Sequence, residues 1–509
     1  MNHSLSNPVP GPARSFRGLL TASCAAVLLT ACASFDGIAP SSQLQQPANY
    51  AAAESLPGQH GQWPDASWAR ALGGEPLQSL IDEALAGNPG LQVAQARVAA
   101  AKAAAEVAGA NGDPVWSATF DATYQRYTEN GIIPPPLAGS YKTDSQLALN
   151  FSYDFDFWGR HAAEFRSAIS QDKAAQAEQY NARLVISTAV ARAWVQLAQQ
   201  YEQRDLNQQQ LEVGEKLQKL ARLRYDAGLD AKSDEEQIKQ LIASLRATQA
   251  QLDEAIVLTR NQLAALMGQG PDRGLRIPRP TLPVEEAIAL PDELPLTLLG
   301  RRPDITAARW RVEAAQGDID AAKTAFYPNV NLVAFAGFSA IGLDNLLESG
   351  SRVAGIGPAI SVPILDSTRL RGGLKQRVAT YDAQVATYNQ TLTEALHDVA
   401  DQVKSLQSAI AQSRQQELAT QAAANTLQLA RDRERVGTTN MLPVLQSQLF
   451  YLFQKRIDLD SQARRSEMHI ALIKALGGGF DSQAQGLIHD AHDNNSSSNN
   501  DSPSVSNAS

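Results

Sequence analysis

The clearest pattern along the chain is a strict alternation of apolar and polar residues between Leu147 and Phe157. Odd positions are apolar and mostly aromatic, while the even positions between them are small or polar. Alternation of this kind predicts a β-strand with two unlike faces, because successive side chains of a strand point to opposite sides. The carboxylates of Asp154 and Asp156 are therefore expected on one face and the aromatic rings on the other. On this interpretation the two aspartates face water.

Three further strands are expected from similar patterns. Residues 355–364 alternate between apolar and small side chains, and partner strands are expected at about 115–125 and 330–339. These strands form two hairpins, at about 115–157 and 330–365. About ten residues is the length of a transmembrane β-strand. Four strands cannot close a barrel and an open edge cannot face lipid. Either the strands lie outside a membrane, or several chains share one barrel, and three chains would supply twelve strands.

Each hairpin is followed by a long stretch that favours helix. Between Arg160 and Ala227 the only glycine or proline is Gly214, and between Leu374 and Val436 there is none. About 65 helical residues would span about 95 Å, so such a helix must pack against others, as in a coiled coil. The core of a soluble bundle would show the same apolar stripe. Apolar residues at helical spacing are Leu206, Val213, Leu217, Leu220, Leu223, Leu392, Leu396, Val399, Val403 and Leu406.

The body of the chain consists of two copies of one unit. Pro89 matches Pro303 in the first helix of each copy, and the runs "LARLRYDAGLD" and "LARDRERVGTT" align with Gly228 on Gly437. The predicted organisation has six parts. A signal peptide at 1–31 is followed by a lipidated N-terminus and linker at 32–75 and a first repeat at 76–268, with long helices at about 160–267. A connecting segment at 269–300 leads to a second repeat at 301–478, with long helices at about 369–476, and to a disordered polar tail at 479–509.

Composition and charge exclude several classes of protein. The 509 residues carry a formal net charge of −9, and no basic stripe indicates nucleic acid. No stretch after the N-terminal segment has 18 consecutive apolar residues, so no membrane-spanning helix is expected. The tail contains His489 and His492, for which a solvated tail is favoured over a metal site. No cofactor is expected.

The first residues have the features of an export signal. Arg14 and Arg17 precede the apolar run "GLLTASCAAVLLTA". Residues 29–32, Leu-Thr-Ala-Cys, resemble a bacterial lipobox, which implies cleavage before Cys32 and an N-palmitoyl, S-diacylglycerol cysteine. An ordinary signal peptide with an incidental cysteine is the alternative. Cys24 and Cys32 are the only cysteines, so the exported chain has no disulfide.

An enzyme is the contrasting hypothesis. The sequence has no P-loop, no GxSxG elbow and no HExxH motif, and its seven histidines are scattered. Asp154 and Asp156 share one strand face, but a hydrolase would need a pocket where the sequence predicts long helices.

In several short motifs the chain resembles the TolC-type outer-membrane efflux channels, in the lipoprotein branch that serves tripartite pumps. These motifs are the lipobox, "DFWGR", "FYPNV", "VPILD" and two "RxxxG" segments, and together they cover about 75–477. The resemblance implies an α+β membrane protein whose four strands contribute to a trimeric twelve-strand barrel, with antiparallel coiled-coil helices forming a periplasmic tunnel. It implies a homotrimer that contacts outer-membrane lipid, docks onto a periplasmic adaptor and serves an inner-membrane transporter, usually proton-driven and of the RND type.

The function implied is a passive duct that exports drugs, antibiotics or toxic organic acids and confers resistance. A channel of the same fold for type I protein secretion is the alternative. A periplasmic coiled-coil structural lipoprotein is a further one, but it would not explain the duplicated strands.

The same resemblance places the periplasmic entrance at the helix tips, where the duct would be gated. The tip residues are Arg224, Gly228, Arg433, Gly437 and Thr439. Pro443 and Gln446 stand where some relatives have aspartate, which weakens an acidic ring from the second copy. The first copy offers Asp234, Glu235 and Glu236, of which Asp234 is expected to line the entrance. A solvated helix face is the alternative for Asp234.

Overall fold

The computed structural model describes residues 34–46, 50, 61–65, 67–282, 294–363 and 366–487. The predicted signal peptide, Cys32, His489 and His492 lie outside the described residues. The chain divides into two compact units. Unit 1 contains the described residues of 34–43, 101–172 and 311–386, and unit 2 contains those of 44–100, 173–310 and 387–487.

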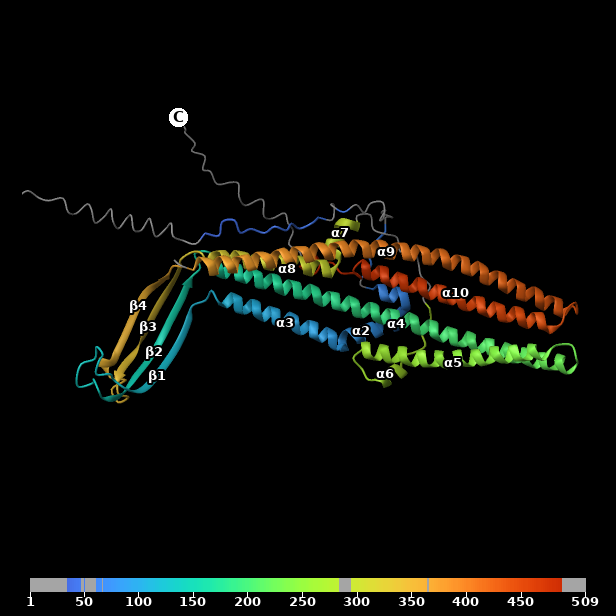
Figure 1. Cartoon of the computed structure of the whole chain (residues 1–509), viewed down its shortest axis with the longest axis horizontal. Coiled ribbons are helices and arrows are strands. Elements are labelled where there is room, and N and C mark those ends of the chain that lie inside the picture. Colours follow the sequence, from blue (N-terminus) through green and yellow to red (C-terminus); the bar gives the residue numbers. More distant parts are fainter. Residues whose placement is uncertain are drawn as a thin grey trace, which may run out of the picture. The chain divides into compact units, whose positions relative to one another are not determined.

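Unit 1 contains one antiparallel sheet of four strands in the order β1-β2-β3-β4 (Figure 1). The strands are β1 (Val115–Arg126), β2 (Tyr141–Phe155), β3 (Asn329–Ile341) and β4 (Arg352–Ser361). Both predicted hairpins are therefore present. The two hairpins join through β2 and β3, where Leu149 lies opposite Ala336. The sheet is thus continuous across the two repeats.

The register gives the sheet one apolar and one polar face. Residues paired across antiparallel strands share a face, and Trp116 pairs with Phe151 while Ser117 pairs with Asn150. The apolar face is exposed, with Trp116 64% and Ile356 77% accessible. That face carries Trp116, Phe120, Tyr124, Leu147, Leu149, Phe151, Tyr153, Phe155, Val330, Leu332, Phe338, Ile356 and Ile360. Its polar exceptions, Arg126, Thr143, Ser145 and Arg352, lie toward the hairpin-turn end of the strands.

The polar face has a different composition. Its polar side chains are Ser117, Thr119, Asp121, Thr123, Gln125, Lys142, Asp144, Gln146, Asn150, Ser152, Asp154, Asn329, Asn331, Ser339 and Ser361. Val115, Val333, Phe335, Ile341 and Val353 are apolar exceptions, and Gly337, Gly355 and Gly357 leave parts of the face without side chains. Such a division between the faces suits a sheet with water on one side and an apolar medium on the other.

The two long predicted helices are present. α4 (Arg160–Asp226) has 67 residues and α9 (Ser367–Arg435) has 69. Each is followed by a helix of 35 residues, α5 (Lys232–Leu266) or α10 (Met441–Ala475). In unit 2, α4 packs against α10 through Leu206, Val213, Leu217, Leu445, Leu452 and Leu459, and against α5 through Leu211, Ile242 and Leu245.

The predicted apolar stripes are buried except near one end. Leu220 is partly buried, and Leu392, Leu396, Val399, Val403 and Leu406 are at most 7% accessible. Leu223 is 67% accessible instead, because it lies three residues before α4 ends. Within the described residues, no helix is long and apolar enough to cross a membrane.

Shorter helices complete the fold. They are α2 (Trp68–Gly87), α3 (Pro89–Ala110), α6 (Pro271–Leu275), α7 (Leu294–Arg301) and α8 (Pro303–Thr324). α2 begins inside the segment predicted as a linker, which is a correction. The physical reason is burial: Trp68, Leu77 and Leu80 are all less than 9% accessible and join the core of unit 2.

Another part of the predicted linker is bound along α9. In unit 1, Asp382 accepts hydrogen bonds from the backbone N–H groups of Ser41 (3.1 Å) and Ser42 (2.9 Å) and from the Ser41 hydroxyl (2.7 Å). The Arg371 guanidinium donates to the carbonyl oxygen of Ser34, and the Phe35 ring lies 5.5 Å from that of Phe326. We call residues 34–43 the N-terminal strap.

The packed body also extends beyond the predicted start of the polar tail. Leu487 is fully buried and Phe480 is 8% accessible. The Trp310 indole donates to the Leu487 carbonyl, and the Arg301 guanidinium lies 3.3 Å from the Asp481 carboxylate. Residues 479–487 therefore belong to the packed body, because two apolar side chains anchor an otherwise polar segment.

Candidate functional site

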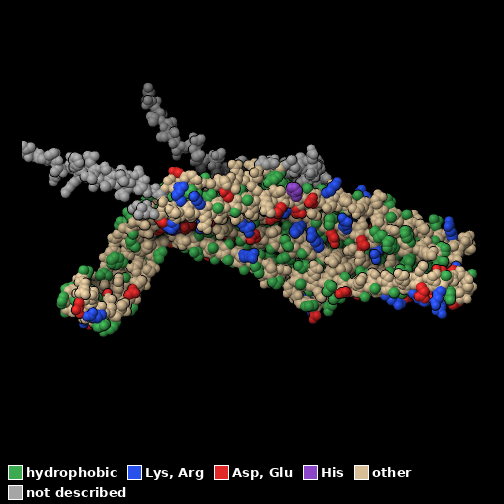
Figure 2. All heavy atoms as spheres, viewed as in Figure 1, with side chains coloured by type: hydrophobic (Ala, Val, Ile, Leu, Met, Phe, Trp, Pro, Cys, Tyr) green, Lys and Arg blue, Asp and Glu red, His purple; other side chains and the backbone are tan. Residues whose placement is uncertain are grey.

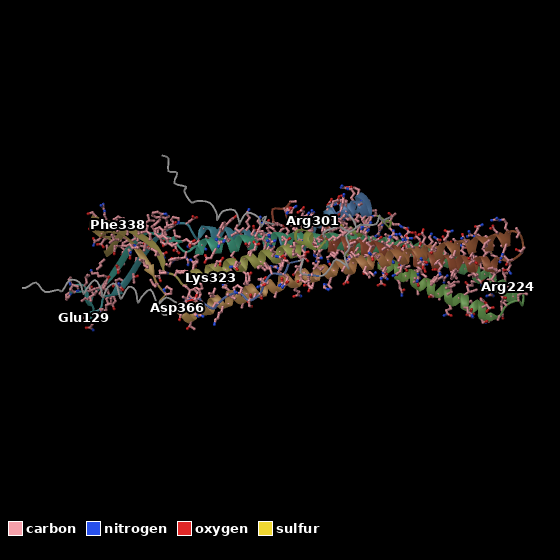
Figure 3. The ribbon with its side chains drawn as sticks, turned by 90° about the horizontal axis from the view of Figure 1, so that it is seen from above. Glu129, Arg224, Arg301, Lys323, Phe338 and Asp366 are labelled. Carbon is pink, nitrogen blue, oxygen red and sulfur yellow. The ribbon has the colours of Figure 1, made fainter. Side chains whose placement is uncertain are left out.

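The sequence predicts a functional site at the two helix tips of unit 2. We define the first tip as residues 222–239, between α4 and α5, and the second tip as residues 431–448, between α9 and α10. Figure 3 shows Arg224 at the first tip. Figure 2 shows acidic and basic side chains gathered at the tips.

Both tips end their long helix with the same backbone motif. Gly228 has φ of +74° and Gly437 has φ of +77°, a left-handed conformation that favours glycine. The N–H of Leu229 donates to the Arg224 carbonyl, and that of Thr438 to the Arg433 carbonyl, both at 2.9 Å. These are the six-to-one hydrogen bonds of a Schellman motif. The "RxxxG" pattern is thus explained by helix termination, with glycine two residues after the last helical residue and arginine in the last turn of the helix.

The arginines of the two motifs have different surroundings. In the first tip, the Arg224 guanidinium donates to both carboxylate oxygens of Asp230, at 2.7 and 2.8 Å. This hydrogen bonding raises the pKa of Arg224 and lowers the pKa of Asp230. We call this bidentate pair the clasp. A bidentate pair fixes geometry as well as charge, so it holds the turn closed.

The second tip has no clasp. Thr439 occupies the position of Asp230, and within the part of the chain that the structure describes the exposed Arg433 side chain has no ion pair. Arg435 pairs with Asp432 at 3.0 Å. The second tip therefore presents an uncompensated guanidinium that the first tip does not.

The first turns of α5 and α10 also differ. Asp234 is exposed, and Glu235 is only 4% accessible and bonded to Lys239 at 2.9 Å. The Lys239 hydrogen bond lowers the pKa of Glu235. In the second tip, Pro443 is half-buried, Val444 is buried and Gln446 is exposed. Only the first tip thus brings carboxylates to this turn.

Asp154 and Asp156 lie where the sheet gives way to helix. Asp154 is on the polar face, opposite Asn331, as predicted. It also accepts a hydrogen bond from Arg160, with His161 Nε2 3.2 Å away. Asp156 lies beyond the end of β2, which corrects its assignment to the strand. Its Oδ2 accepts from the Ala162 N–H at 3.1 Å, in the first turn of α4. Asp156 therefore stabilises the start of the helix.

The same junction contains two stacked aromatic rings. The rings of Trp158 and Tyr327 lie 4.5 Å apart at 16°, and the Trp158 indole donates to the Pro328 carbonyl at 2.7 Å. This contact joins the "DFWGR" segment of the first repeat to the "FYPNV" segment of the second. Over the described residues, no group of three or more His, Cys, Asp or Glu side chains is placed to hold a metal ion.

Comparison with protein families assigns the fold. The family described as outer membrane efflux protein matches residues 80–269 and 294–478. The chain belongs to the outer membrane efflux protein family. It is therefore an outer-membrane efflux channel that extends into the periplasm, of the kind that serves tripartite pumps, and not an enzyme. The two matched segments correspond to the two repeats.

Individual relatives agree with this family assignment. The multidrug resistance outer membrane protein MdtP of Escherichia coli O6:H1 is 30% identical over 426 residues, which cover 82% of this chain and 87% of MdtP. The fusaric acid resistance protein FusA of Burkholderia cepacia is 35% identical over 315 residues, which cover 61% of this chain and 59% of FusA.

Solved structures of the family agree with the fold. The crystal structure of VceC from Vibrio cholerae matches with a TM-score of 0.75 and 39% identity, over 82% of this chain and all of VceC. The structure of the outer-membrane channel OprN matches with a TM-score of 0.75 and 25% identity, over 87% of this chain and 97% of OprN.

Proposed function

We propose that three copies of the chain form one duct through the outer membrane, which exports drugs and toxic organic acids. The observation that carries the proposal is the two-faced sheet with open edges at β1 and β4. Pairing β4 of one copy with β1 of the next satisfies those edges and gives twelve strands. The apolar face then meets lipid, and the polar face, with Asp121, Asp144 and Asp154, meets water.

Cysteine crosslinking tests this arrangement. Single cysteines are placed on β1 and β4 at positions that face outward along the edges, in a chain whose other cysteines are only Cys24 and Cys32. The expected result is a crosslinked trimer that sits in the outer membrane and migrates anomalously in electrophoresis until heated. A soluble monomer, or crosslinks that stop at dimers, would contradict the proposal.

The printed names of MdtP and FusA support drugs and organic acids as the exported compounds. Deletion is expected to sensitise cells to amphipathic toxic compounds, and expression of the chain is expected to restore resistance. Unchanged sensitivity across a broad panel, together with loss of a secreted protein, would favour protein secretion instead. The mechanism is passive, because the inner-membrane transporter supplies the energy and this chain supplies a water-filled path.

We further propose that the mature chain begins at Cys32 and is anchored by lipid there. The N-terminal strap supports this proposal, because Arg371 and Phe326 hold Ser34 and Phe35 on the unit that contains the sheet. A lipid on Cys32 would then enter the membrane beside the strands. Labelled fatty acid should enter the wild type and not Cys32→Ala. Equal labelling of both proteins would refute the anchor.

The two tips are proposed as the gate and as the docking site for a periplasmic adaptor. The first tip is closed on itself by the clasp, whereas the second tip offers Arg433 to an acidic group of the partner. Arg433→Glu is therefore expected to abolish resistance without changing trimer assembly. Arg433→Lys is the conservative control and should retain most activity. If Arg433→Glu left both resistance and adaptor binding intact, this division of roles between the tips would be wrong.

Asp234 is proposed to line the periplasmic entrance. Asp234 is exposed and can face the entrance, whereas the neighbouring Glu235 is buried against Lys239 and cannot. Asp234→Asn should reduce the preference for cations measured in planar bilayers, with Asp253→Asn, further along α5, as the control. If the two variants had the same cation selectivity, Asp234 would be assigned to a solvated helix face and not to the entrance.

A further inference from the structure

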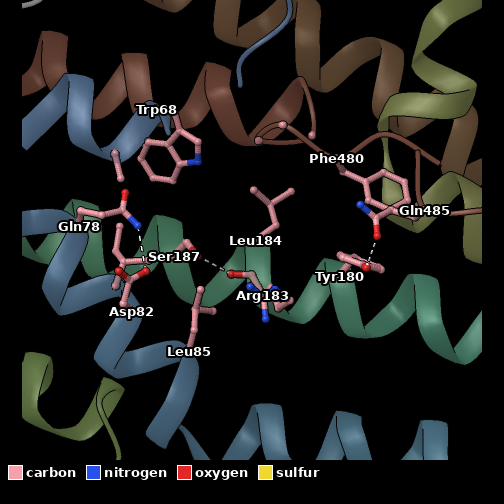
Figure 4. Close-up of a pocket in the computed structure, with 15 residues that line it drawn as sticks. Trp68, Gln78, Asp82, Leu85, Tyr180, Arg183, Leu184, Ser187, Phe480 and Gln485 are labelled. Atoms are coloured by element: carbon pink, nitrogen blue, oxygen red, sulfur yellow. Dashed lines mark hydrogen bonds between the residues drawn. The ribbon is translucent and has the colours of Figure 1, made fainter. Parts of the chain in front are cut away.

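Unit 2 contains a cavity of about 260 Å³ beside α2 and α4 (Figure 4). Polar side chains at its wall pair with one another: the Gln78 amide donates to the Asp82 carboxylate, and the Tyr180 hydroxyl donates to the Gln485 amide oxygen. Unit 1 contains another cavity, of about 250 Å³, where the sheet ends and the helices begin. At about 30 Å³ per water molecule, it has room for about eight waters or one small organic molecule. We call it the junction cavity.

Aromatic rings form one part of the junction cavity. Phe155, Trp158 and Tyr327 line it, and the last two rings are the stacked pair that joins the two repeats. Trp158 is 49% and Tyr327 40% accessible, so both rings can be reached by a molecule in the cavity. The electron-rich face of an aromatic ring attracts an organic cation, and most strongly so when the ring is that of tryptophan.

The guanidinium groups at the cavity wall are already paired with carboxylates. Arg160 donates to Asp154, and Arg369 Nε donates to Asp366 at 2.7 Å. Each arginine and its aspartate together carry no net charge. These two pairs therefore leave the balance of charge to the remaining ionised group of the wall.

That remaining group is the carboxylate of Asp156. It lines the cavity, its side chain is exposed, and among the described residues it has no ion pair. Its one hydrogen bond, to Oδ2 from the Ala162 N–H, leaves most of the acceptor sites of a carboxylate free. Because the aspartate side chain is short, its carboxylate stays close to the cavity. The cavity thus combines accessible aromatic rings with one uncompensated negative charge.

A metal ion does not suit this arrangement. A calcium ion takes six to eight oxygen ligands, and several of them are usually carboxylates. Over the described residues, no group of three or more His, Cys, Asp or Glu side chains is placed to hold a metal. An organic ammonium ion needs only one carboxylate and an aromatic surface.

We propose that the junction cavity binds an organic ammonium ion. The ammonium group lies beside Asp156 and the Trp158 ring, and its apolar substituents contact Phe155 and Leu370, which also line the cavity. A free organic cation and the head group of an ethanolamine lipid share this chemistry. The lipid as a source rests on the proposed membrane position of the strands, whereas the site itself does not.

Equilibrium dialysis of the purified full chain in maltoside detergent at neutral pH tests the site. Phenyltrimethylammonium is the probe, and we expect saturable binding below about 10 mM. Benzenesulfonate, of similar size and opposite charge, should show no saturable binding. The absence of saturable binding of phenyltrimethylammonium, or equal binding of the two ions, would overturn the proposal.

Variants assign the contacts. Asp156→Asn removes the charge but keeps an acceptor for the Ala162 N–H, and it should weaken probe binding at least about tenfold. Trp158→Leu should weaken binding, and Trp158→Phe should retain most of it. Arg369→Gln should have the opposite effect, up to about fivefold tighter binding, because it leaves Asp366 without its cation.

Asp344→Asn is the matched control. This exposed aspartate belongs to the same unit but lies in the connection between β3 and β4, at the opposite end of the sheet. It should bind the probe as the wild type does. Heat-modifiable electrophoresis checks that each variant is folded. If folded Asp156→Asn bound phenyltrimethylammonium as tightly as Asp344→Asn does, the assigned site would be wrong.

A second set of measurements distinguishes the two sources of the ammonium group. The dialysis is repeated with dioleoylphosphatidylethanolamine added to the maltoside micelles. Weaker probe binding in the presence of the lipid, seen in the wild type and in Asp344→Asn, would support the lipid head group as the occupant. Unchanged binding would overturn the lipid source and assign the cavity to a free organic cation.

Discussion

Gly337 is the position at which the sheet tolerates no side chain. It lies in β3 opposite Ala148 of β2, where the two repeats join. A Cβ atom at Gly337 would lie 2.0 Å from the Leu147 carbonyl oxygen and 2.7 Å from Ala148 Cα. Relief of such an overlap requires the strands to separate by more than 1 Å, against a normal spacing of about 4.8 Å. The ladder bonds beside Gly337 would then exceed hydrogen-bonding distance.

Gly337→Ala should therefore be strongly destabilising. Two backbone groups left without partners cost about 1–3 kcal/mol each, so the loss is about 2–6 kcal/mol. Gly357 supplies the matched control, because it lies on the same face in β4 and nothing is within 4 Å of its added Cβ. The assay is the yield of heat-modifiable oligomer in the outer-membrane fraction. Gly337→Ala should reduce the yield severely, and Gly357→Ala should not. Equal yields from the two variants would refute the geometric reasoning.

Three further predictions concern the strap, the contact between the start and the end of the second repeat, and the tips. Hydrogen bonds, chiefly from Ser42 N–H, lower the pKa of Asp382, so its contribution to stability is present above the ordinary pKa of about 3.9 and is lost as the pH falls through the lowered value. Thermal unfolding should show Asp382→Asn less stable than wild type at pH 7, with a difference that shrinks as the pH falls below the ordinary pKa, and a difference that does not change with pH would be contrary to this account. Arg302 has a side chain that is 13% accessible, pairs with Asp304 at 2.7 Å and donates to the Ala475 carbonyl at 3.0 Å, so Arg302→Met should cost about 1–3 kcal/mol in urea unfolding for the orphaned carbonyl alone, more than Arg301→Met. An added Cβ atom at Gly228 or Gly437 meets no steric obstacle, but alanine there must adopt a positive φ, which costs about 1–2 kcal/mol of stability at each tip. Limited proteolysis of Gly228→Ala or Gly437→Ala should therefore show faster cleavage at the altered tip only. Unchanged cleavage would argue against a strained turn.

The fold was largely predictable from the sequence because the two-residue period of the strands and the helical period of the long helices have few interruptions. A strand whose faces meet different media must alternate, and the run from Leu147 to Phe155 does so without an exception. A helix of 67 residues must lack helix breakers, and α4 contains a single glycine. By contrast, the start of α2 was assigned to the linker, because Gly73, Gly74 and Pro76 lie close together there. The packing of residues 479–487 was missed because Phe480 and Leu487 are isolated in a polar segment.

The site was less predictable than the fold. The repeat alignment located both tips, because Gly228 and Gly437 mark the ends of equivalent helices. It did not reveal that Arg224 would reach Asp230, since the side chains meet across a turn whose geometry no periodicity describes. The substitution of Asp230 by Thr439 was visible in the alignment, but its meaning depended on that contact. Asp156 was assigned to the strand because the alternation continues to Phe157, two residues beyond the end of β2.

The N-terminal strap has a consequence for the order in which the channel is made. Ser41 is held by Asp382, 341 residues further along the chain. The N-terminus is synthesised and exported first, yet Asp382, which holds it, is made only when 127 of the 509 residues remain. Residues 34–43 must therefore remain unseated while most of the chain crosses the inner membrane. Seating of the strap would therefore report that the chain has been made at least as far as Asp382, and would distinguish such chains from shorter ones.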